Sequence, residues 1–326
     1  MEALLSIKNL SIGIRRQNQL LSPVEDISFE IYPGEILGLV GESGSGKSLT
    51  ALSIPGLLDE GKEVTSGSIL FKENLNIDRN LLKLTEKELE AIRGKEISFV
   101  FQEPFSSLNP LVKVGKQIAE TLELHGEKDR SLAKSRAREL MARLRLPEPE
   151  KLAESYPHRL SGGMCQRVMI AMAIICRPRL LIADEPTTAL DQSTQSQILD
   201  LLKEINRDLG TSMLFISHDL AVVKNLCSRV LVMYSGRILE EGDTEEVFSN
   251  PAHEYTKGLL GSIPDKANRG MLAIHGRIPS LEEGRPQGCP FHPRCGRAGP
   301  RCKTQFPPEI LLNAKHKTHC IIEERR

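Results

Sequence analysis

The chain contains no tryptophan, and aromatic residues make up only 4% of its 326 residues. Proteins that bind single-stranded nucleic acid usually stack the bases on aromatic side chains, so this scarcity argues against such a ligand. There is no excess of positive charge either, since 43 basic residues balance 43 acidic ones. The chain as a whole would not attract a phosphate backbone, and we expect no nucleic-acid partner.

Long apolar segments are also missing. No run approaches the roughly 18 apolar residues that suggest a membrane-spanning helix, so we expect no segment to cross a bilayer by itself. The longest apolar run, Val168–Cys176, has the length of a buried helix. The first residues lack a basic region followed by an apolar core, so no secretory signal is expected.

What the chain does have is a glycine-rich segment, Gly41–Ser48, that fits the phosphate-loop pattern G-x-x-x-x-G-K-[ST]. The apolar run Ile36–Val40 before it is typical of a buried strand, and residues 49–52 after it are typical of a helix start. In such a loop the backbone N–H groups and the helix N-terminus bind phosphate oxygens. We therefore expect a nucleoside triphosphate site, with Lys47 on the β- and γ-phosphates and the Ser48 hydroxyl on Mg²⁺. The residues expected at the nucleotide are Gly41, Ser43, Gly44, Ser45, Gly46, Lys47, Ser48 and Leu49.

Polar residues that suit ATP hydrolysis follow two further apolar runs. Asp184 ends the run Leu180–Ala183, and a carboxylate there can bind Mg²⁺, usually through water. Glu185 comes next and can orient or deprotonate the attacking water. His218 follows the run Met213–Ile216 and can hydrogen-bond the γ-phosphate. Each residue alone is compatible with a capping or solvated side chain, but their order after a phosphate loop favours a hydrolytic site.

The alternation of strand-like runs and amphipathic helical patterns up to about Leu260 predicts an α/β domain over residues 1–260. Further strand candidates are Ile97–Phe101 and Val230–Met233. Residues 104–160 instead show helical spacing with charged faces, which predicts a helical subdomain. Its clearest helix spans 131–144, with apolar residues at Leu132, Ala133, Ala137, Leu140, Met141 and Leu144. Residues 261–326 are rich in Gly, Pro, Arg and Cys, which predicts a small separate C-terminal module.

A Ser-Gly-Gly turn, within Leu160–Arg167 (LSGGMCQR), opens the apolar helix. Free N–H groups at this helix start form a second anion site together with the Ser161 hydroxyl. The segment resembles the signature loop of ABC transporter nucleotide-binding subunits. Other features of that family are present in the family's order along the chain, namely Gln102 at the Q-loop before this segment, and Ala189-Leu190-Asp191 at the D-loop and His218 at the switch position after it. The resemblance implies a P-loop NTPase (RecA-like) core sheet with a helical subdomain.

The resemblance also implies a head-to-tail dimer with a second ABC ATPase, either a copy or a paralogue. ATP on the phosphate loop of one subunit would be covered by the signature loop of the other, which adds Ser161, Gly162, Gly163 and Asp191 to the nucleotide site. Hydrolysis, with Glu185 as base and Gln102 and His218 beside it, would then release the dimer. The implied Mg²⁺ ligands are Ser48, Gln102 and Asp184.

The family works at a membrane, so the resemblance implies peripheral attachment to the cytoplasmic face of the inner membrane. The helical segment after Gln102 would carry the dimer motion to two membrane-spanning permease subunits, and an extracytoplasmic substrate-binding protein would act indirectly. One family feature is missing here. An aromatic side chain near the N-terminus usually stacks on adenine, whereas the matching segment offers only Ile14, and Tyr32 is a poor substitute.

Two motifs in the C-terminal region indicate the class of transported substrate. Residues 250–256 (NPAHEYT) and 288–295 (GCPFHPRC) resemble the oligopeptide and dipeptide importer branch of the family. This implies an ATPase that energises peptide uptake. Related subunits serve nickel-chelate importers, so a metal chelate is the alternative cargo. A soluble ABC protein outside transport and a redox-sensing ATPase are further alternatives, although the chain has neither a second cassette nor a coiled-coil insertion.

The seven cysteines are unevenly distributed. Three of them are scattered and expected to be small buried residues: Cys165, Cys176 and Cys227. The other four crowd the C-terminal region with spacing C-x5-C-x6-C-x17-C: Cys289, Cys295, Cys302 and Cys320. Structural zinc sites usually have ligand pairs about two to four residues apart, so the spacing favours a [4Fe–4S] cluster, which the resemblance also implies. Zinc, with help from His292, His316 or His319, and thiols that are unligated or form disulfides, remain alternatives.

Overall fold

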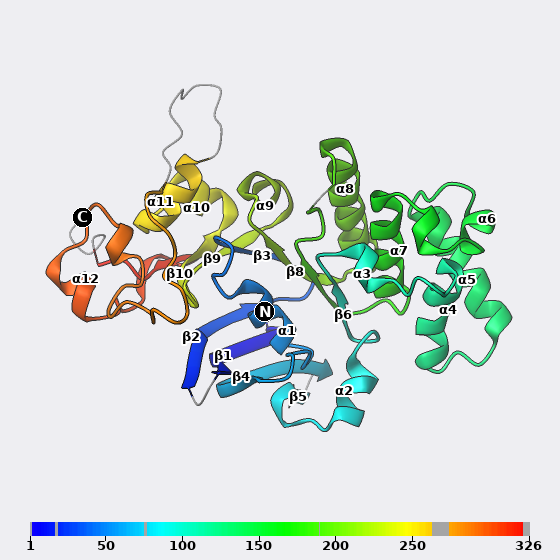
Figure 1. Cartoon of the computed structure of the whole chain (residues 1–326), viewed down its shortest axis with the longest axis horizontal. Helices are drawn as coiled ribbons and strands as arrows, with labels where there is room; N and C mark the ends of the chain where they lie inside the picture. The colour runs from blue at the N-terminus through cyan, green and yellow to red at the C-terminus, as the bar shows by residue number, and fades with distance from the viewer. Residues whose placement is uncertain (1, 17–18, 75–76, 189, 263–273, 322–326) are drawn as a thin grey trace. The chain divides into compact units, whose positions relative to one another are not determined.

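The structure is a computed structural model that describes residues 2–16, 19–74, 77–188, 190–262 and 274–321. It divides into two compact units (Figure 1). Unit 1 consists of Met1–Lys83 and Phe215–Arg326, and unit 2 consists of Leu84–Leu214. Both units combine helices with strands, as the sequence pattern predicts. In the described part of the chain, none of the helices has both the length and the apolar character needed to cross a membrane.

Unit 1 contains two groups of paired strands. One is an antiparallel sheet with the order β2-β1-β4-β5. The other has the order β11-β12-β10-β9-β3, in which only β3 and β9 run parallel. Their bounds are β1 Leu5–Arg16, β2 Gln19–Ile31, β3 Ile36–Val40, β4 Lys62–Asn74, β5 Ile77–Asn80, β9 Arg229–Tyr234, β10 Arg237–Asp243, β11 Ile310–Asn313 and β12 His316–Thr318.

The helices of unit 1 are short. They are α1 Lys47–Ser53, α9 Leu220–Leu226, α10 Thr244–Ser249, α11 Glu254–Gly261 and α12 Pro300–Thr304, with 3₁₀ turns at Leu81–Lys83 and His292–Arg294. Every residue of β3 is buried, as expected for a continuous apolar run in a parallel pair. Cys227, at the end of α9, is buried as predicted. Burial raises the pKa of its thiol, so it is chemically a small apolar residue.

Unit 2 carries most of the long helices. Its elements are α2 Glu86–Ile92, β6 Ile97–Val100, α3 Pro104–Ser107, α4 Val114–Leu124, α5 Arg130–Arg143, α6 Pro149–Ala153, a 3₁₀ turn Pro157–Arg159, α7 Gly162–Ile174, β7 Leu180–Asp184 and α8 Gln192–Leu209. Strands β6 and β7 pair in parallel. Strand β8, Ser212–Ser217, spans the residues where the chain leaves unit 2. The expected strands are all present: β3 has the predicted bounds, and the others differ from the prediction by at most one residue at either end.

The helical region of unit 2 confirms the periodic pattern except at Leu132, which is exposed, and at Leu140, which is half-buried. Ala133, Ala137 and Met141 on α5 are fully buried. Leu132 was counted in the same apolar set, but it is 39% exposed, because its position falls outside the stripe that these three residues form. On α7, Cys165 is buried as expected, whereas Cys176, just after that helix, is only half-buried.

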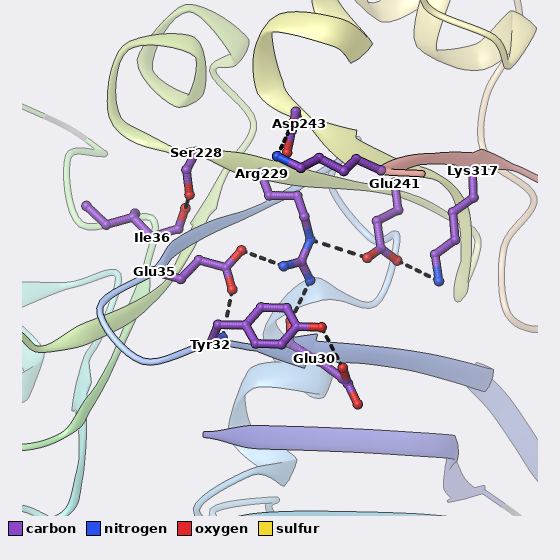
Figure 2. Close-up of polar contacts among 10 residues, drawn as sticks. Glu30, Tyr32, Glu35, Ile36, Ser228, Arg229, Glu241, Asp243 and Lys317 are labelled. Atoms are coloured by element: carbon purple, nitrogen blue, oxygen red, sulfur yellow. Dashed lines mark hydrogen bonds and ion pairs between the residues drawn. The ribbon is translucent and has the colours of Figure 1, made fainter. Parts of the chain in front are cut away.

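Arg229, at the start of β9, connects three segments of unit 1 (Figure 2). Its guanidinium lies 2.5 Å from a carboxylate oxygen of Glu35, 2.6 Å from the carbonyl oxygen of Glu30 and 3.3 Å from a carboxylate oxygen of Glu241. Lys317 on β12 lies 3.2 Å from the other Glu241 oxygen. Burial raises the pKa of Glu35, and Arg229 opposes that rise. The network therefore ties β2, β10 and β12 to the start of β9.

The C-terminal segment shares this sheet. Strand β12 pairs antiparallel with β10, and a buried carboxylate, Glu240, joins the two. Glu240 accepts hydrogen bonds from the backbone N–H groups of Ala252 (2.7 Å) and His253 (2.8 Å) and lies 2.8 Å from Nε2 of His316. Strands β11 and β12 thus extend the sheet of unit 1, and the predicted separate C-terminal module is not confirmed.

Candidate functional site

The phosphate loop lies between β3 and α1, as predicted from the sequence. Its conformation requires glycine at Gly41, where a Cβ atom would lie 2.1 Å from the carbonyl oxygen of Met233. The loop also needs glycine at Gly46, which caps α1 with a φ of 104°. Ser45 anchors the loop to the turn after β9, because its carbonyl oxygen accepts a 2.8 Å hydrogen bond from the N–H of Gly236. Ser43, Gly44 and Ser48 are exposed, so they are accessible to a ligand.

Lys47 folds back over the loop. Its Nζ donates to the carbonyl oxygens of Gly41 and Glu42, each at 2.9 Å, and the residue is only 5% exposed. An ammonium held by carbonyl oxygens can exchange them for phosphate oxygens, which carry more negative charge. The geometry therefore suits the predicted contact with phosphates.

Glu42 is the second residue of the loop, and the C-terminal segment holds it. Its backbone N–H donates to the hydroxyl of Tyr255 at 2.9 Å. Its two carboxylate oxygens accept from Nη1 of Arg294 at 2.9 and 3.0 Å. Tyr255 and Arg294 lie in the motifs NPAHEYT and GCPFHPRC, but neither role is predictable from the sequence, because contacts over 213 and 252 positions leave no local pattern.

In unit 2, the structure brings two of the predicted catalytic residues into contact. The side-chain amide of Gln102, which follows β6, donates to a carboxylate oxygen of Glu185 at 3.1 Å. The hydroxyl of Thr188 donates to the same oxygen at 3.0 Å. Glu185 also adopts a φ of 47°, which is rare for residues other than glycine. Such backbone strain persists only where surrounding contacts enforce it and is common at functional sites.

Asp184 is the last residue of β7 and is 6% exposed. Its carboxylate and the hydroxyl of Ser48 are oxygen donors of the kind that Mg²⁺ prefers. Ser48 belongs to unit 1 and Asp184 to unit 2, and the chemistry of each donor fits the predicted metal role.

The predicted signature loop opens α7. Ser161 caps this helix and accepts a 3.3 Å hydrogen bond from the N–H of Met164. A Cβ atom at Gly163 would lie 2.6 Å from Cγ2 of Thr194, so this position requires glycine for the close approach of α7 and α8. Asp191 caps α8, accepting from the N–H of Thr194 at 2.9 Å and from its hydroxyl at 2.7 Å. These hydrogen bonds lower the pKa of Asp191. Ala189, part of the predicted D-loop, lies outside the described residues.

His218 follows β8 and is exposed. Its neighbour Asp219 caps α9 by accepting from the N–H of Ala221 at 2.9 Å, so the histidine stands just before a capped helix. Tyr32, which the sequence offered as a poor adenine contact, lies under Arg229, with the guanidinium carbon 5.3 Å from the ring centre, and donates its hydroxyl proton to Glu30 (Figure 2).

The four C-terminal cysteines line one small cavity, together with His253, His292 and His319. They are Cys289, Cys295, Cys302 and Cys320. Within the described ranges, no two cysteines form a disulfide, and no three His, Cys, Asp or Glu side chains are placed to hold one metal ion. Burial raises the pKa of the Cys289 thiol to about 12 and also raises the pKa of Cys295. The cavity thus gathers the predicted ligands, but the structure does not confirm a metal site.

Comparison with known proteins identifies the family. A model described as ABC transporter matches residues 24–188, and a model described as oligopeptide/dipeptide transporter, C-terminal region, matches residues 239–302. The dipeptide transport ATP-binding protein DppD of Bacillus subtilis is 42% identical, covering 100% of this chain and 96% of that protein. The oligopeptide transport ATP-binding proteins OppD of Haemophilus influenzae and of Escherichia coli are each 44% identical, covering 93% and 94% of this chain and 92% and 90% of theirs.

Solved structures agree with this result. The dimeric ATP-binding cassette MJ0796, in a post-hydrolysis state bound to ADP and Pi, superposes with a TM-score of 0.65 at 29% identity, over 74% of this chain and 98% of the cassette. The cassette cbiO1 of Clostridium perfringens, part of the ABC transporter complex cbiONQ, gives a TM-score of 0.64 at 27% identity, over 77% of this chain and 92% of the cassette. These likenesses confirm the predicted P-loop NTPase fold. The chain therefore belongs to the ABC transporter family, as an ATPase subunit that carries the oligopeptide/dipeptide type of C-terminal region.

Proposed function

We propose that this chain energises the import of dipeptides or oligopeptides. The observation that carries the proposal is the likeness to peptide transport ATP-binding proteins over nearly the whole chain, including the C-terminal region. The family relationship supports action from the cytoplasmic face of the membrane, together with two permease subunits and, indirectly, an extracytoplasmic substrate-binding protein.

In the proposed reaction the phosphate loop binds ATP, and Lys47 exchanges its carbonyl partners for the β- and γ-phosphates. Glu185 accepts a proton from the attacking water, and Gln102, which donates to Glu185 at 3.1 Å, orients that carboxylate. His218 would hydrogen-bond the γ-phosphate. Mg²⁺ bound by Ser48, Asp184 and Gln102 would neutralise charge on the phosphates.

We further propose that two ATPase subunits dimerise head to tail around ATP. Support comes from the solved dimers of related cassettes and from the position of Ser161 at the start of α7, where helix N–H groups suit a phosphate. Ser161 of the partner subunit would cover the ATP on the phosphate loop, and Asp191 would lie near this interface. The second ATPase can be a copy of this chain or a paralogue.

Exposed apolar side chains support contact with a permease. Phe105, on α3 directly after Gln102, is 53% exposed, and Leu111, between α3 and α4, is 85% exposed. Large apolar side chains exposed in one short segment are typical of a protein contact. Their position after Gln102 would let a change at the nucleotide site reach the membrane subunits.

Purification from membranes and reconstitution test the proposal. We expect the tagged chain to co-purify with two membrane subunits and a second ATPase. In proteoliposomes supplied with the binding protein, ATP should drive uptake of a labelled dipeptide or tetrapeptide and not of a nickel chelate. Uptake of the nickel chelate alone would reassign the cargo, and the absence of any membrane subunit would contradict the transport role.

The C-terminal cysteines are proposed ligands of a [4Fe–4S] cluster. All four line one cavity, and four thiols are the ligand set of such a cluster. Each thiolate would bind a different iron, so the four sulfur atoms need not converge on one point as ligands of a single zinc ion must. The cluster would supply a covalent cross-link among segments that contribute few residues to the core.

Replacing Cys289 and Cys295 with serine tests the cluster. After anaerobic purification, we expect the unmodified chain to contain about four irons and an absorption band near 400 nm, and the double variant to lose both, because two of the four ligands are gone. Cys176→Ser serves as the control, since Cys176 lies outside the cavity and is half-buried. Equal iron content in all three proteins would contradict the proposal.

A further inference from the structure

Glu42 places a carboxylate in the phosphate loop. It is the second residue of the phosphate loop, so its negative charge lies in the segment that is proposed to bind a triphosphate. Like charges repel, and the repulsion is stronger near a protein surface than in bulk water. The unmatched carboxylate would therefore weaken nucleotide binding unless a nearby cation compensated it.

Arg294 is that cation. Its Nη1 lies 2.9 and 3.0 Å from the two carboxylate oxygens of Glu42, and its side chain is only 6% exposed. Other contacts also hold the guanidinium. Its Nε donates to the carbonyl oxygen of His275 at 2.9 Å. Its central carbon lies 5.7 Å from the ring centre of Tyr234 and 5.9 Å from that of Phe291. A cation held in this way loses little further side-chain entropy when it pairs.

The rest of Glu42 is held as well. Its backbone N–H donates to the buried hydroxyl of Tyr255, and its carbonyl oxygen accepts from Lys47. When Lys47 moves to phosphate oxygens, the contacts with Tyr255 and Arg294 remain, as does a 3.2 Å hydrogen bond from the N–H of Ser45 to the Glu42 carbonyl oxygen. Tyr255 and Arg294 both come from the part of unit 1 that follows β10, and Arg294 stands between Cys289 and Cys295. The C-terminal region thus reaches the nucleotide site through Glu42.

We propose that Arg294 is a positioning residue for the phosphate loop: it neutralises Glu42 and keeps the loop in the shape that accepts a triphosphate. The inference rests on the proposed function of this loop. It gives the C-terminal region a role in ATP affinity that does not depend on whether the neighbouring cysteines bind a cluster, because every contact named is between side chains and backbone of this chain.

The test compares full-length variants for affinity for a fluorescent ATP analogue, for ATPase KM and kcat, and for melting temperature. Arg294→Met should raise Kd and KM about tenfold while changing kcat little, because the lost interaction acts on binding and not on the hydrolytic step. Glu42→Gln in that background should restore Kd to within about threefold of the unmodified value, since the repelling charge is then gone. Arg297→Met is the matched control, because Arg297 is 48% exposed and pairs with Glu254.

An unchanged Kd in Arg294→Met would overturn the inference. So would a raised Kd that Glu42→Gln fails to restore, because Arg294 would then act only on local folding. Should Arg294→Met not fold, Arg294→Lys replaces it: lysine cannot hold His275 and Glu42 together, so an intermediate Kd is expected, and an unmodified Kd overturns the proposal. If the unmodified chain itself bound no ATP, the proposed function of the loop would fail, which is a separate result.

Discussion

Glu185→Gln is expected to abolish ATP hydrolysis while leaving ATP binding intact. Glutamine has the size and shape of glutamate but cannot accept a proton from water at neutral pH. Loss of a general base lowers kcat by about 10²–10⁴-fold. The amide keeps an oxygen for the hydrogen bonds from Gln102 and Thr188, which the structure places 3.1 and 3.0 Å from the carboxylate, so the local fold should survive.

Because hydrolysis is what would separate the head-to-tail dimer, the same variant should accumulate as an ATP-bound dimer. Steady-state ATPase rates and light scattering with and without ATP measure the two effects. Glu103→Gln is the matched control, since Glu103 is an exposed acid beside Gln102 at the helix cap position of α3, and its side chain makes no cap hydrogen bond. Hydrolysis by Glu185→Gln at the unmodified rate would show that another group is the base.

The structural features that were predicted best are those that depend on a local sequence pattern. Strand β3, the phosphate loop and α1 follow from an apolar run, spaced glycines and a helix start, all within Ile36–Ser53. Buried strands such as β7 were recognisable because both faces are apolar. Glu185 was predicted from its position after a strand and Gln102 from the family resemblance, but their mutual contact joins residues 83 positions apart. Only the parallel pairing of β6 with β7 brings them together.

The C-terminal region shows why the rest was not predictable. Its composition suggested a separate module, yet β12 pairs with β10, and Glu240 binds the backbone at Ala252 and the side chain of His316. A buried carboxylate looks like a surface residue in the sequence until its partners are known. The partner of Arg294 was not predictable either, because Glu42 lies 252 positions away in the sequence. The motif that contains Arg294 does not indicate which residue the arginine binds.

Lys47→Ala is expected to abolish detectable ATP binding at micromolar nucleotide, and with it all hydrolysis. The ammonium would make charge-assisted hydrogen bonds to two phosphates, each worth about 1.5–3 kcal/mol, so their loss should weaken binding by at least about 100-fold. The loop would also lose the two 2.9 Å contacts that Lys47 makes with the carbonyl oxygens of Gly41 and Glu42.

Titration with a fluorescent ATP analogue and steady-state ATPase assays measure the effect of this variant. Lys87→Ala is the control, because Lys87 is an exposed residue of α2 and has the same charge. Melting temperatures of the three proteins without nucleotide separate loss of ligand binding from loss of folding. Since ligand binding stabilises the folded state, ATP should raise the melting temperature of the unmodified chain and of Lys87→Ala but not of Lys47→Ala. An equal rise in all three would show that Lys47 does not hold the phosphates.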